Sequence, residues 1–292
     1  MINDIYYQRG FPDPVFEDDY VLNLVRSFIP GARKVTGVDE TGGEARTYAI
    51  DDGIILKVQR PQQLRLSTSL EKEAFFLKQL AEYDGSISVP RVLGYGKEGT
   101  LEYIIMTRMP GKAVFYSDLT GKQRESMYFE LGKTLRKIHS IDKKPFMESG
   151  LFPDIDAPGD MRERLNFRFN RVLNWRLNAG RIVETDIEEA LKLAAPILET
   201  VPEAEIIVPL HANPGAEHVF VNDDGTFSGV IDFGDSYLSH PIGDFRSTPV
   251  RERSMLLAGY VSEKEISDNF KLIWNAAYAL DSIIDVMCNK QR

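Results

Sequence analysis

The sequence predicts an α+β protein of two lobes, with a β-rich N-terminal lobe over residues 1–108 and a mainly helical C-terminal lobe over residues 109–292. Short β-type runs with turn residues between them fill the chain from Ala32 to about Met106. Beyond Gly111, apolar residues at helical spacing dominate, around one embedded hairpin pattern. The 292 residues are 43% hydrophobic, enough to bury a sizeable core in one or two domains.

In the N-terminal part, residues 47–51 and 54–58 read as a hairpin around a turn at Asp52 and Gly53. Ser69 is the expected N-cap of a helix that continues to residue 83. Two further strand-like runs follow, VPRVLGYG and LEYIIMTRM. Residues 107–111 are the expected hinge between the lobes.

In the C-terminal part, residues 119–141 form an amphipathic helical pattern, with Leu131, Leu135 and Ile138 spaced for one buried face. A loop rich in Pro, Asp and Gly follows. Further helices are expected from there to the end of the chain, around a hairpin of VFVN, the turn DDG and SGVID. The expected segments are the loop at 152–160, helices at 161–179 and 185–200, and the hairpin at 219–232.

Composition limits the compartment and the partners. Cys288 is the only cysteine, which excludes a disulfide within the chain and a cysteine-based zinc site. The start MINDIYYQRG lacks the features of a signal peptide, and no apolar run approaches roughly 20 residues, so we expect a cytoplasmic protein without a membrane partner. The net charge of −9 argues against a nucleic-acid partner and favours neutral or cationic ones, although solubility alone explains such a charge in many proteins.

Lys57 and Glu73 are the first candidates for chemistry. Lys57 ends the apolar run of residues 54–56 in an expected strand, where a lysine needs a partner or must reach solvent. On the next helix, the 100° step places Glu73 on the apolar stripe, while Glu71 and Lys72 point away. The other residues of this stripe are Ala74, Leu77, Leu80 and Ala81. A buried carboxylate needs a cation, so we expect Glu73 to pair with Lys57; the alternative is a rim position in contact with water.

Glycines and aspartates supply further candidates. Gly42 and Gly43 lie between two expected strands, where a flexible turn lets backbone N–H groups approach phosphates; hairpin turns also use glycine for other reasons. Asp232 ends an apolar strand, and its carboxylate is our first choice as a ligand of Mg²⁺, which prefers oxygen. Asp235 and Asp244 are expected to bond backbone amides and hold the loop.

Six segments in consistent order, from about Gly42 to about Asp244, resemble the aminoglycoside phosphotransferase family of kinase-like small-molecule kinases. This family also includes choline and homoserine kinase types. The resemblance implies a protein-kinase-like fold that uses Mg²⁺ with ATP or GTP. The six segments are GGEARTY, ILKVQRP, SLEKEAFFLKQL, the pair VPRVLGYG and YIIMTRMPG, LGKTLRKIHSID, and LHANPGAEHVFVNDDGTFSGVIDFGDSYLSHPIGDF.

The resemblance also assigns roles to residues. The expected nucleotide-binding residues are Gly42, Gly43, Lys57, Glu73, Thr107, Met109 and Ile231. His139 is expected to be a packed structural histidine. The catalytic loop of the family reads His-Gly-Asp, and here His211 matches the histidine that organises the loop, whereas Asn213 stands at the catalytic aspartate. Asp232 matches the metal aspartate, and His218 stands where the family has a metal-binding asparagine.

The departures weaken the expected chemistry without removing it. Asn213 can accept a hydrogen bond from a substrate hydroxyl but cannot take its proton. General-base assistance is worth about 10² to 10⁴ in rate, whereas phosphoryl transfer draws most of its acceleration from positioning and charge stabilisation. A neutral imidazole at His218 can bind a metal, although Mg²⁺ prefers oxygen. Glu217 is open to three interpretations: metal ligand, substitute base or solvated loop residue. The unusual Pro214 and Gly215 favour natural divergence over an engineered Asp-to-Asn change.

The predicted function is transfer of the terminal phosphate of ATP or GTP to a hydroxyl of a small molecule. The net charge fits a neutral or cationic acceptor, and the resemblance implies a compound such as an aminoglycoside. The acidic loop at 154–160 and the helices after it are expected to recognise this acceptor. The alternative is a nucleotide-binding pseudokinase that acts as a sensor or binding module. A third reading is the same fold without nucleotide binding. Thermal shift with nucleotide and Mg²⁺, together with a measurement of turnover, distinguishes the three.

Overall fold

An antiparallel five-stranded sheet forms the N-terminal part of the computed structural model, which describes residues 15–60, 69–99, 101–152 and 161–290. The strand order is β1-β2-β3-β5-β4, and every neighbouring pair is antiparallel. Two helices, α1 (Asp18–Arg26) and α2 (Leu70–Tyr83), pack against the sheet. The strands are β1 (Val35–Asp39), β2 (Ala45–Ile50), β3 (Ile54–Gln59), β4 (Val92–Glu98) and β5 (Leu101–Thr107).

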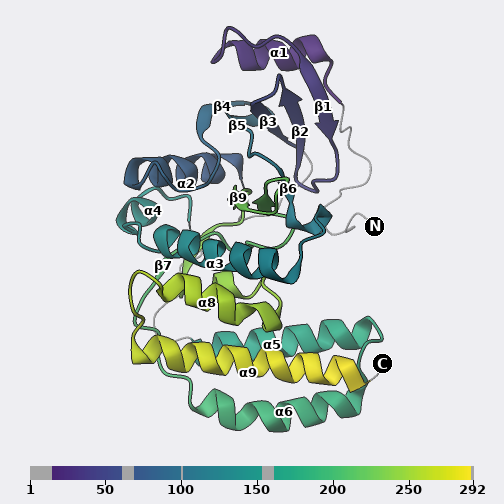
Figure 1. The fold of residues 1–292 in the computed structure, drawn as a ribbon, viewed down its shortest axis with the longest axis vertical. Helices are drawn as coiled ribbons and strands as arrows, with labels where there is room; N and C mark the ends of the chain where they lie inside the picture. The colour runs from purple at the N-terminus through teal and green to yellow at the C-terminus, as the bar shows by residue number, and fades with distance from the viewer. Residues whose placement is uncertain (1–14, 61–68, 100, 153–160, 291–292) are drawn as a thin grey trace.

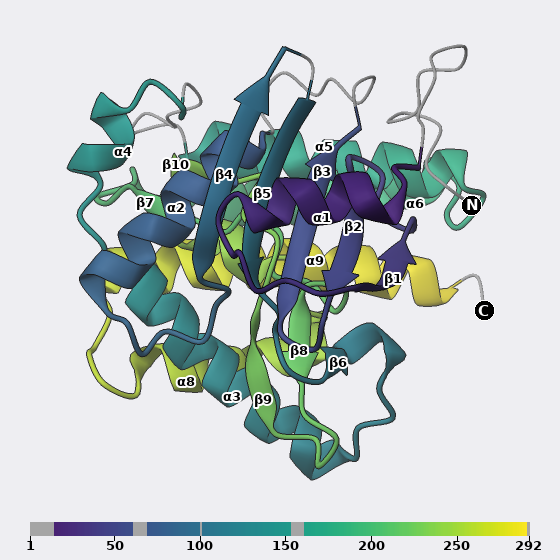
Figure 2. The same cartoon turned by 90° about the horizontal axis from the view of Figure 1, so that it is seen from above.

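The two faces of the sheet bury different residues, because successive side chains of a strand point to opposite faces. Ile105 packs with Val21 and Val25 of α1, whereas its neighbours Ile104 and Met106 join the larger core that includes α2. In the view from above, α1 lies across the sheet and α2 runs beside β4 (Figure 2). The sheet is therefore covered on both faces.

The C-terminal part is mainly helical and lies in successive layers below the sheet (Figure 1). Helices α3 and α8 form the layer next to the β-rich part, and α5, α9 and α6 lie beyond them. Short strands in this part form two small sheets: β6, β8 and β9 form one, and β7 and β10 form the other. The helices are α3 (Gly121–Ile138), α4 (Lys144–Glu148), α5 (Met161–Asn178), α6 (Glu184–Glu199), α7 (Ile242–Phe245), α8 (Arg253–Val261) and α9 (Asp268–Lys290); the strands are β6 (Lys112–Ala113), β7 (Val208–Leu210), β8 (Val219–Val221), β9 (Phe227–Val230) and β10 (Tyr237–Ser239).

The predicted α+β class, with a β-rich N-terminal lobe and a mainly helical remainder, is confirmed. Ser69 caps α2 as expected, because its side chain accepts a hydrogen bond from the N–H of Lys72. The loop expected at 152–160 lies, apart from Phe152, outside the described residues. The lobe boundary at residues 108 and 109 stays a prediction.

Two details of α2 were predicted wrongly. Lys72 was expected to point away, but only 2% of its surface is exposed and its Nζ lies 5.2 Å from the centre of the Phe152 ring. Ala81 was expected on the buried side and is exposed. For Lys72 the cause is a second packed face: Phe76 of α2 also packs against Phe146 of α4, which a single apolar stripe does not reveal.

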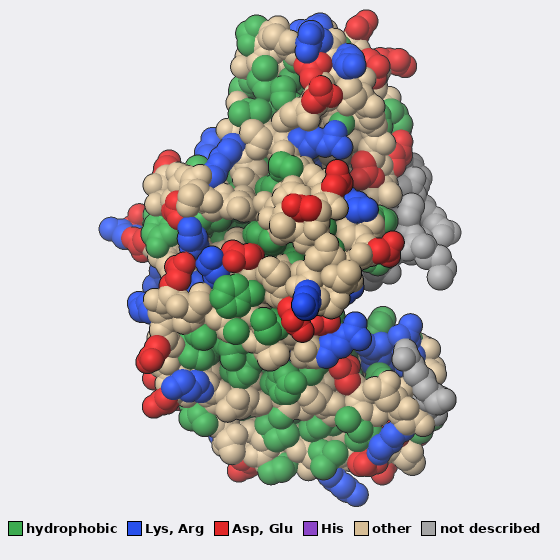
Figure 3. Space-filling model, in the orientation of Figure 1, with side chains coloured by type: hydrophobic (Ala, Val, Ile, Leu, Met, Phe, Trp, Pro, Cys, Tyr) green, Lys and Arg blue, Asp and Glu red, His purple; other side chains and the backbone are tan. Residues whose placement is uncertain are grey.

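On the face drawn in Figure 3, acidic and basic side chains are interspersed over the β-rich half, and hydrophobic side chains gather over the helical half. A recess enters this face between the β-rich part and the layer of α5, α6 and α9, with Lys and Arg side chains on its lower border (Figure 3). Among the described residues, no helix combines the length and apolar character required to cross a membrane.

Two glycines let α3 and α8 cross with their backbones in contact. A Cβ added at Gly132 would overlap the carbonyl oxygen of Leu256, and one added at Gly259 would overlap that of Phe129. Such an overlap involves rigid helix backbone, so the helices would have to separate and lose packing.

We therefore expect Gly259→Ala to lower the free energy of unfolding by roughly 3 kcal/mol, measured by urea denaturation. The matched control is Gly121→Ala in the first turn of α3, where an added Cβ meets no atom within 4 Å. This control is expected to be neutral or slightly stabilising because alanine has the higher helix propensity. Equal effects of the two substitutions would contradict the role of the close crossing.

Candidate active site

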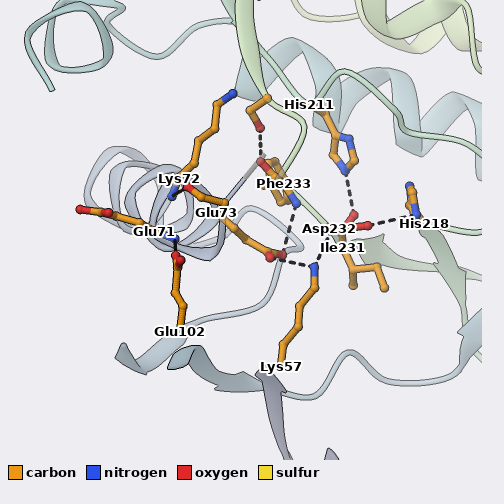
Figure 4. Close-up of polar contacts among 12 residues, drawn as sticks. Lys57, Glu71, Lys72, Glu73, Glu102, His211, His218, Ile231, Asp232 and Phe233 are labelled. Atoms are coloured by element: carbon orange, nitrogen blue, oxygen red, sulfur yellow. Dashed lines mark hydrogen bonds and ion pairs between the residues drawn. The ribbon is translucent and has the colours of Figure 1, made fainter. Parts of the chain in front are cut away.

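Lys57 joins the two parts of the protein through two carboxylates (Figure 4). Its Nζ lies 2.8 Å from Oε2 of Glu73 on α2 and 2.5 Å from Oδ1 of Asp232, which follows β9. The second carboxylate oxygen of Glu73 accepts a hydrogen bond from the N–H of Phe233 at 3.3 Å. The predicted Lys57–Glu73 pair is therefore present, and Asp232, 175 residues away from Lys57 in the sequence, completes it.

Lys57, Glu73 and Asp232 shift one another's pKa values. Burial alone would lower the pKa of Lys57, but the carboxylates of Asp232 and Glu73 raise it well above its ordinary value. Burial raises the pKa of Asp232, but the charge of Lys57 and its hydrogen bond to this carboxylate, together with the nearby His218, outweigh burial and hold the pKa well below its usual range. Glu73 is only 1% exposed, and burial raises its pKa against the effect of Lys57. The Lys57 ammonium is thus the counter-ion of Asp232, whereas at Glu73 its attraction only partly offsets the burial that raises the pKa.

The loop between β7 and β8 carries His211 and Asn213. His211 is fully buried; its Nε2 lies 2.8 Å from the carbonyl oxygen of Ile231, and its Nδ1 lies 3.3 Å from the N–H of Asn213. These partners require a neutral ring with the proton on Nε2. Burial also lowers the pKa of His211, which agrees with this state. His211 consequently links the loop to the strand end that precedes Asp232.

Asp244 on α7 holds the same loop from below. Its two oxygens accept hydrogen bonds from the N–H groups of His211 at 2.8 Å and Ala212 at 2.7 Å. One of them also lies 2.9 Å from Nε2 of His139, whose Nδ1 contacts the hydroxyl of Tyr260. The structural roles expected for Asp244 and His139 are both present.

Two residues of the site, one in this loop and one after β9, have backbone conformations that residues other than glycine rarely adopt. Ala212 has φ of 77° and Asp232 has φ of 71°, both in the left-handed region. Such a residue costs on the order of 1–3 kcal/mol and persists where surrounding contacts enforce it. At Ala212 the enforcing contact is the hydrogen bond to Asp244. Held backbone of this kind is common at functional sites.

Asn213 is exposed, and its side-chain oxygen lies 3.4 Å from Oγ of Ser247. Its carbonyl oxygen lies 2.8 Å from Nδ1 of His218, so that nitrogen carries a proton and donates. Glu217 beside it is exposed. The amide of Asn213 is thus open to a bound molecule while its backbone is fixed at both sides.

His218 and Asp232 form the candidate metal position. Nε2 of His218 lies 3.2 Å from Oδ2 of Asp232, and the Asp232 side chain keeps 38% of its surface exposed. Because Nδ1 is the donor, a neutral ring would turn the Nε2 lone pair toward the carboxylate; a proton on Nε2 or a cation between the groups makes this contact favourable. No group of three or more His, Cys, Asp or Glu residues able to hold a metal occurs in the part of the chain that the structure describes. The carboxylate of Asp232 and the imidazole of His218 are two candidate ligands, and a site of this kind is compatible with an ion such as Mg²⁺ that takes further oxygens from phosphates and water.

The remaining predicted nucleotide residues lie around β3. Gly42 and Gly43 precede β2, in which Thr47 pairs with Lys57, so these glycines lie beyond the hairpin end nearest Gln59. Thr107 pairs with Ile54 at the other end of β3. Met109 is 9% exposed and packs at Gly229. The strand thus places the glycines and the expected hinge on either side of Lys57 along its length.

Comparison with known proteins decides the family. A model of the family described as "Phosphotransferase enzyme family" matches residues 38–280. The chain belongs to this family. No curated protein matches the sequence.

Solved structures share the fold of this phosphotransferase family member. The ternary complex of streptomycin, ATP and APH(2″)-IIa is 17% identical with a TM-score of 0.56, over 95% of this chain and 98% of that chain. Macrolide 2′-phosphotransferase type I is 16% identical with a TM-score of 0.60, over 94% and 92%. Spectinomycin phosphotransferase APH(9)-Ia with ADP and spectinomycin is 16% identical with a TM-score of 0.61, over 95% and 88%. At these identities the similarity shows the kinase-like fold alone.

Sequence reasoning missed two contacts at the site of this family member. The backbone N–H of Phe233 donates a hydrogen bond to Glu73, and a backbone donor cannot be predicted from the residue type. Ser247 reaches Asn213 from 34 positions away, after α7. A serine in that loop carries no signal of its own.

His240, next to α7, provides a test of the packing below the loop. It is 2% exposed, its Nδ1 accepts a hydrogen bond from the N–H of Ile242, and burial and then His139 lower its pKa to about 3. Because the folded pKa lies below the unfolded value of roughly 6.5, the stabilisation is complete above pH 6.5 and is lost as pH falls toward 3.

From pH 7 to pH 5, His240 alone is expected to lower the free energy of unfolding by about 2 kcal/mol. Urea denaturation at both pH values checks this in the native protein and in His240→Asn, whose side-chain oxygen can replace Nδ1 as acceptor. The variant is expected to lose that part of the pH dependence. An unchanged pH dependence would contradict the neutral buried state of His240.

Proposed function

We propose that this protein is a Mg²⁺-dependent phosphotransferase that moves the terminal phosphate of ATP or GTP onto a hydroxyl of a small molecule. The observation that carries the proposal is Lys57 held between Glu73 and Asp232, close to a loop that exposes Asn213. Family membership supports the same class of reaction. In the comparison structures, ATP or ADP occupies related folds.

In this proposal Lys57, oriented by Glu73, binds oxygens of the α and β phosphates. Gly42 and Gly43 offer backbone N–H groups to the phosphates, and the segment from Thr107 to Met109 together with Ile231 contacts the purine. Asp232 and His218 hold the metal. When bound, Mg²⁺ neutralises charge on the phosphates and on the oxygen that leaves.

Asn213 orients the acceptor in this scheme. Its exposed amide oxygen accepts a hydrogen bond from the attacking hydroxyl, and His211 keeps the loop in place. The hydroxyl oxygen forms a bond to the terminal phosphorus, the bond to the bridging oxygen breaks, and the hydroxyl proton leaves to solvent or to the transferred phosphate. The Asn213 amide cannot take that proton, so we expect slow transfer.

The test is incubation with ATP or GTP, Mg²⁺ and a panel of hydroxylated small molecules, with products read by mass spectrometry. A product heavier by one phosphoryl group supports the proposal. Absence of product with both Asn213 and Asn213→Asp protein would count against the enzyme for those acceptors.

A second function, a nucleotide-binding pseudokinase, is favoured by the amide at position 213. Such a protein would have the Lys57 cluster and the candidate metal position but would lack the carboxylate that assists transfer. Thermal stabilisation by nucleotide and Mg²⁺ without any turnover would support this alternative. No thermal shift with any nucleotide would oppose both functions.

A further inference from the structure

Three arginines from separate elements converge close to the loop that carries Asn213. Arg253 of α8 donates from Nη1 to Oδ2 of Asp281 on α9 at 2.6 Å, and Nη1 of Arg168 on α5 lies 3.6 Å from the same oxygen. Nη2 of Arg253 also donates to the carbonyl oxygen of Arg246 at 3.3 Å. We call Arg168, Arg246 and Arg253 the arginine cluster.

The arginine cluster carries more positive charge than its described surroundings neutralise. Asp281 is the carboxylate that pairs with Arg168 and Arg253, and no hydrogen-bond or ion-pair partner for the half-buried Arg246 side chain occurs among the residues described in the structure. Burial, and then the charge of Arg246, lower the pKa of Arg168 to about 9. Burial lowers the pKa of Arg246 as well. Partly buried cations that repel one another favour an additional anion.

The cluster adjoins the candidate acceptor position. Arg246 precedes Ser247, whose hydroxyl lies 3.4 Å from the amide oxygen of Asn213. Tyr237 interacts electrostatically with Arg246 and Arg168, and it pairs with Leu210, the residue before His211, in the β7–β10 ladder. Lys57, which contacts Glu73 and Asp232, is a separate cation assigned to the nucleotide. The arginine cluster therefore lies in the helical C-terminal part next to Asn213, where we expect the acceptor to bind.

Resting on the proposed function, we propose that the acceptor carries an anionic group, a carboxylate or a phosphate ester, which Arg246 and Arg168 bind. A guanidinium offers parallel N–H donors that match the oxygens of either group. This replaces the cationic acceptor that the net charge of −9 favoured, because the local charge at the site outweighs the overall charge. A cationic compound would be repelled by the arginine cluster.

Four six-carbon polyhydroxylated compounds that differ in charge test this: glucosamine, glucose, gluconate and glucose 6-phosphate. Calorimetric titration of the full chain, with and without ADP and Mg²⁺, gives their dissociation constants. At least one anionic compound is expected to bind 10-fold or more tightly than glucose, and glucosamine no better than glucose. Comparison of gluconate with glucose 6-phosphate distinguishes a carboxylate site from a phosphate site.

The key variant is Arg246→Gln, which removes a guanidinium that makes no hydrogen bond or ion pair with the residues described in the structure, so the fold should stay intact. It is expected to weaken anion binding at least 10-fold and to leave ADP binding unchanged. The matched control, Arg251→Gln, makes the same charge change at an exposed residue paired with Glu252 and should keep the preference for anionic compounds.

Three outcomes would each overturn the inference: equal or tighter binding of glucosamine, no preference among the four compounds, or unchanged anion binding in Arg246→Gln. Anion preference without phosphoryl transfer from ATP would sustain it and count against the proposed enzyme instead.

Discussion

Replacing Lys57 with methionine is expected to lower phosphoryl transfer by about 10² to 10³-fold and to weaken nucleotide binding, because a fixed cation that meets the phosphates is lost. Methionine keeps an unbranched chain of similar length, so the strand remains packed. The measurements are the transfer rate with a working acceptor and the calorimetric affinity for ADP with Mg²⁺. If transfer and affinity stay within a factor of three, Lys57 is not the phosphate ligand.

Loss of the Lys57 ammonium also leaves Glu73, 1% exposed, without its cation. Breaking a buried pair by removing one partner costs roughly 3–5 kcal/mol, and protonation of Glu73 can reduce this loss. A double variant, Lys57→Met with Glu73→Gln, separates stability from function. The glutamine oxygen can still accept from the N–H of Phe233, so urea denaturation should show recovered stability while transfer stays low. Recovery of both would mean that Lys57 acts only through the fold.

Local signals explain why much of the fold was predictable. The turn at Asp52 and Gly53, the cap at Ser69 and the period of the α3 face are each determined by residues close in sequence. The error at Lys72 arises from contacts that α2 makes with a distant segment. A helical wheel describes one helix and cannot reveal a second partner.

At the site, the same distinction holds. Lys57 and Glu73 lie 16 positions apart, and the cost of burying a lone charge was enough to pair them. Asp281, which is 113 positions from Arg168, joins Arg168 and Arg253 in the arginine cluster, and Arg246 joins it through its carbonyl oxygen, which accepts a hydrogen bond from Arg253. Arginines are common on exposed helices, so no local pattern distinguishes these three before the chain is folded.

Replacing Asn213 with aspartate is expected to raise the transfer rate by about 10² to 10⁴-fold, the usual worth of a positioned general base. A carboxylate at this exposed position, with the loop held by His211 and Asp244, can take the proton that the amide cannot. The added base should also give the rate an acidic limb near the ordinary aspartate pKa, absent from the native protein. Single-turnover kinetics across pH measure both effects.

Two control variants identify what limits the native protein. Asn213→Ala removes the hydrogen-bond acceptor for the substrate hydroxyl, and we expect transfer below the native rate because orientation is lost. Glu217→Gln tests the substitute base: if Glu217 takes the proton, this variant loses about 10²-fold, and Asn213→Asp then gains little. If Glu217→Gln is neutral and Asn213→Asp still gives no increase, proton removal does not limit the rate. Positioning of the phosphates by Lys57 and Asp232 would then be the step that sets it.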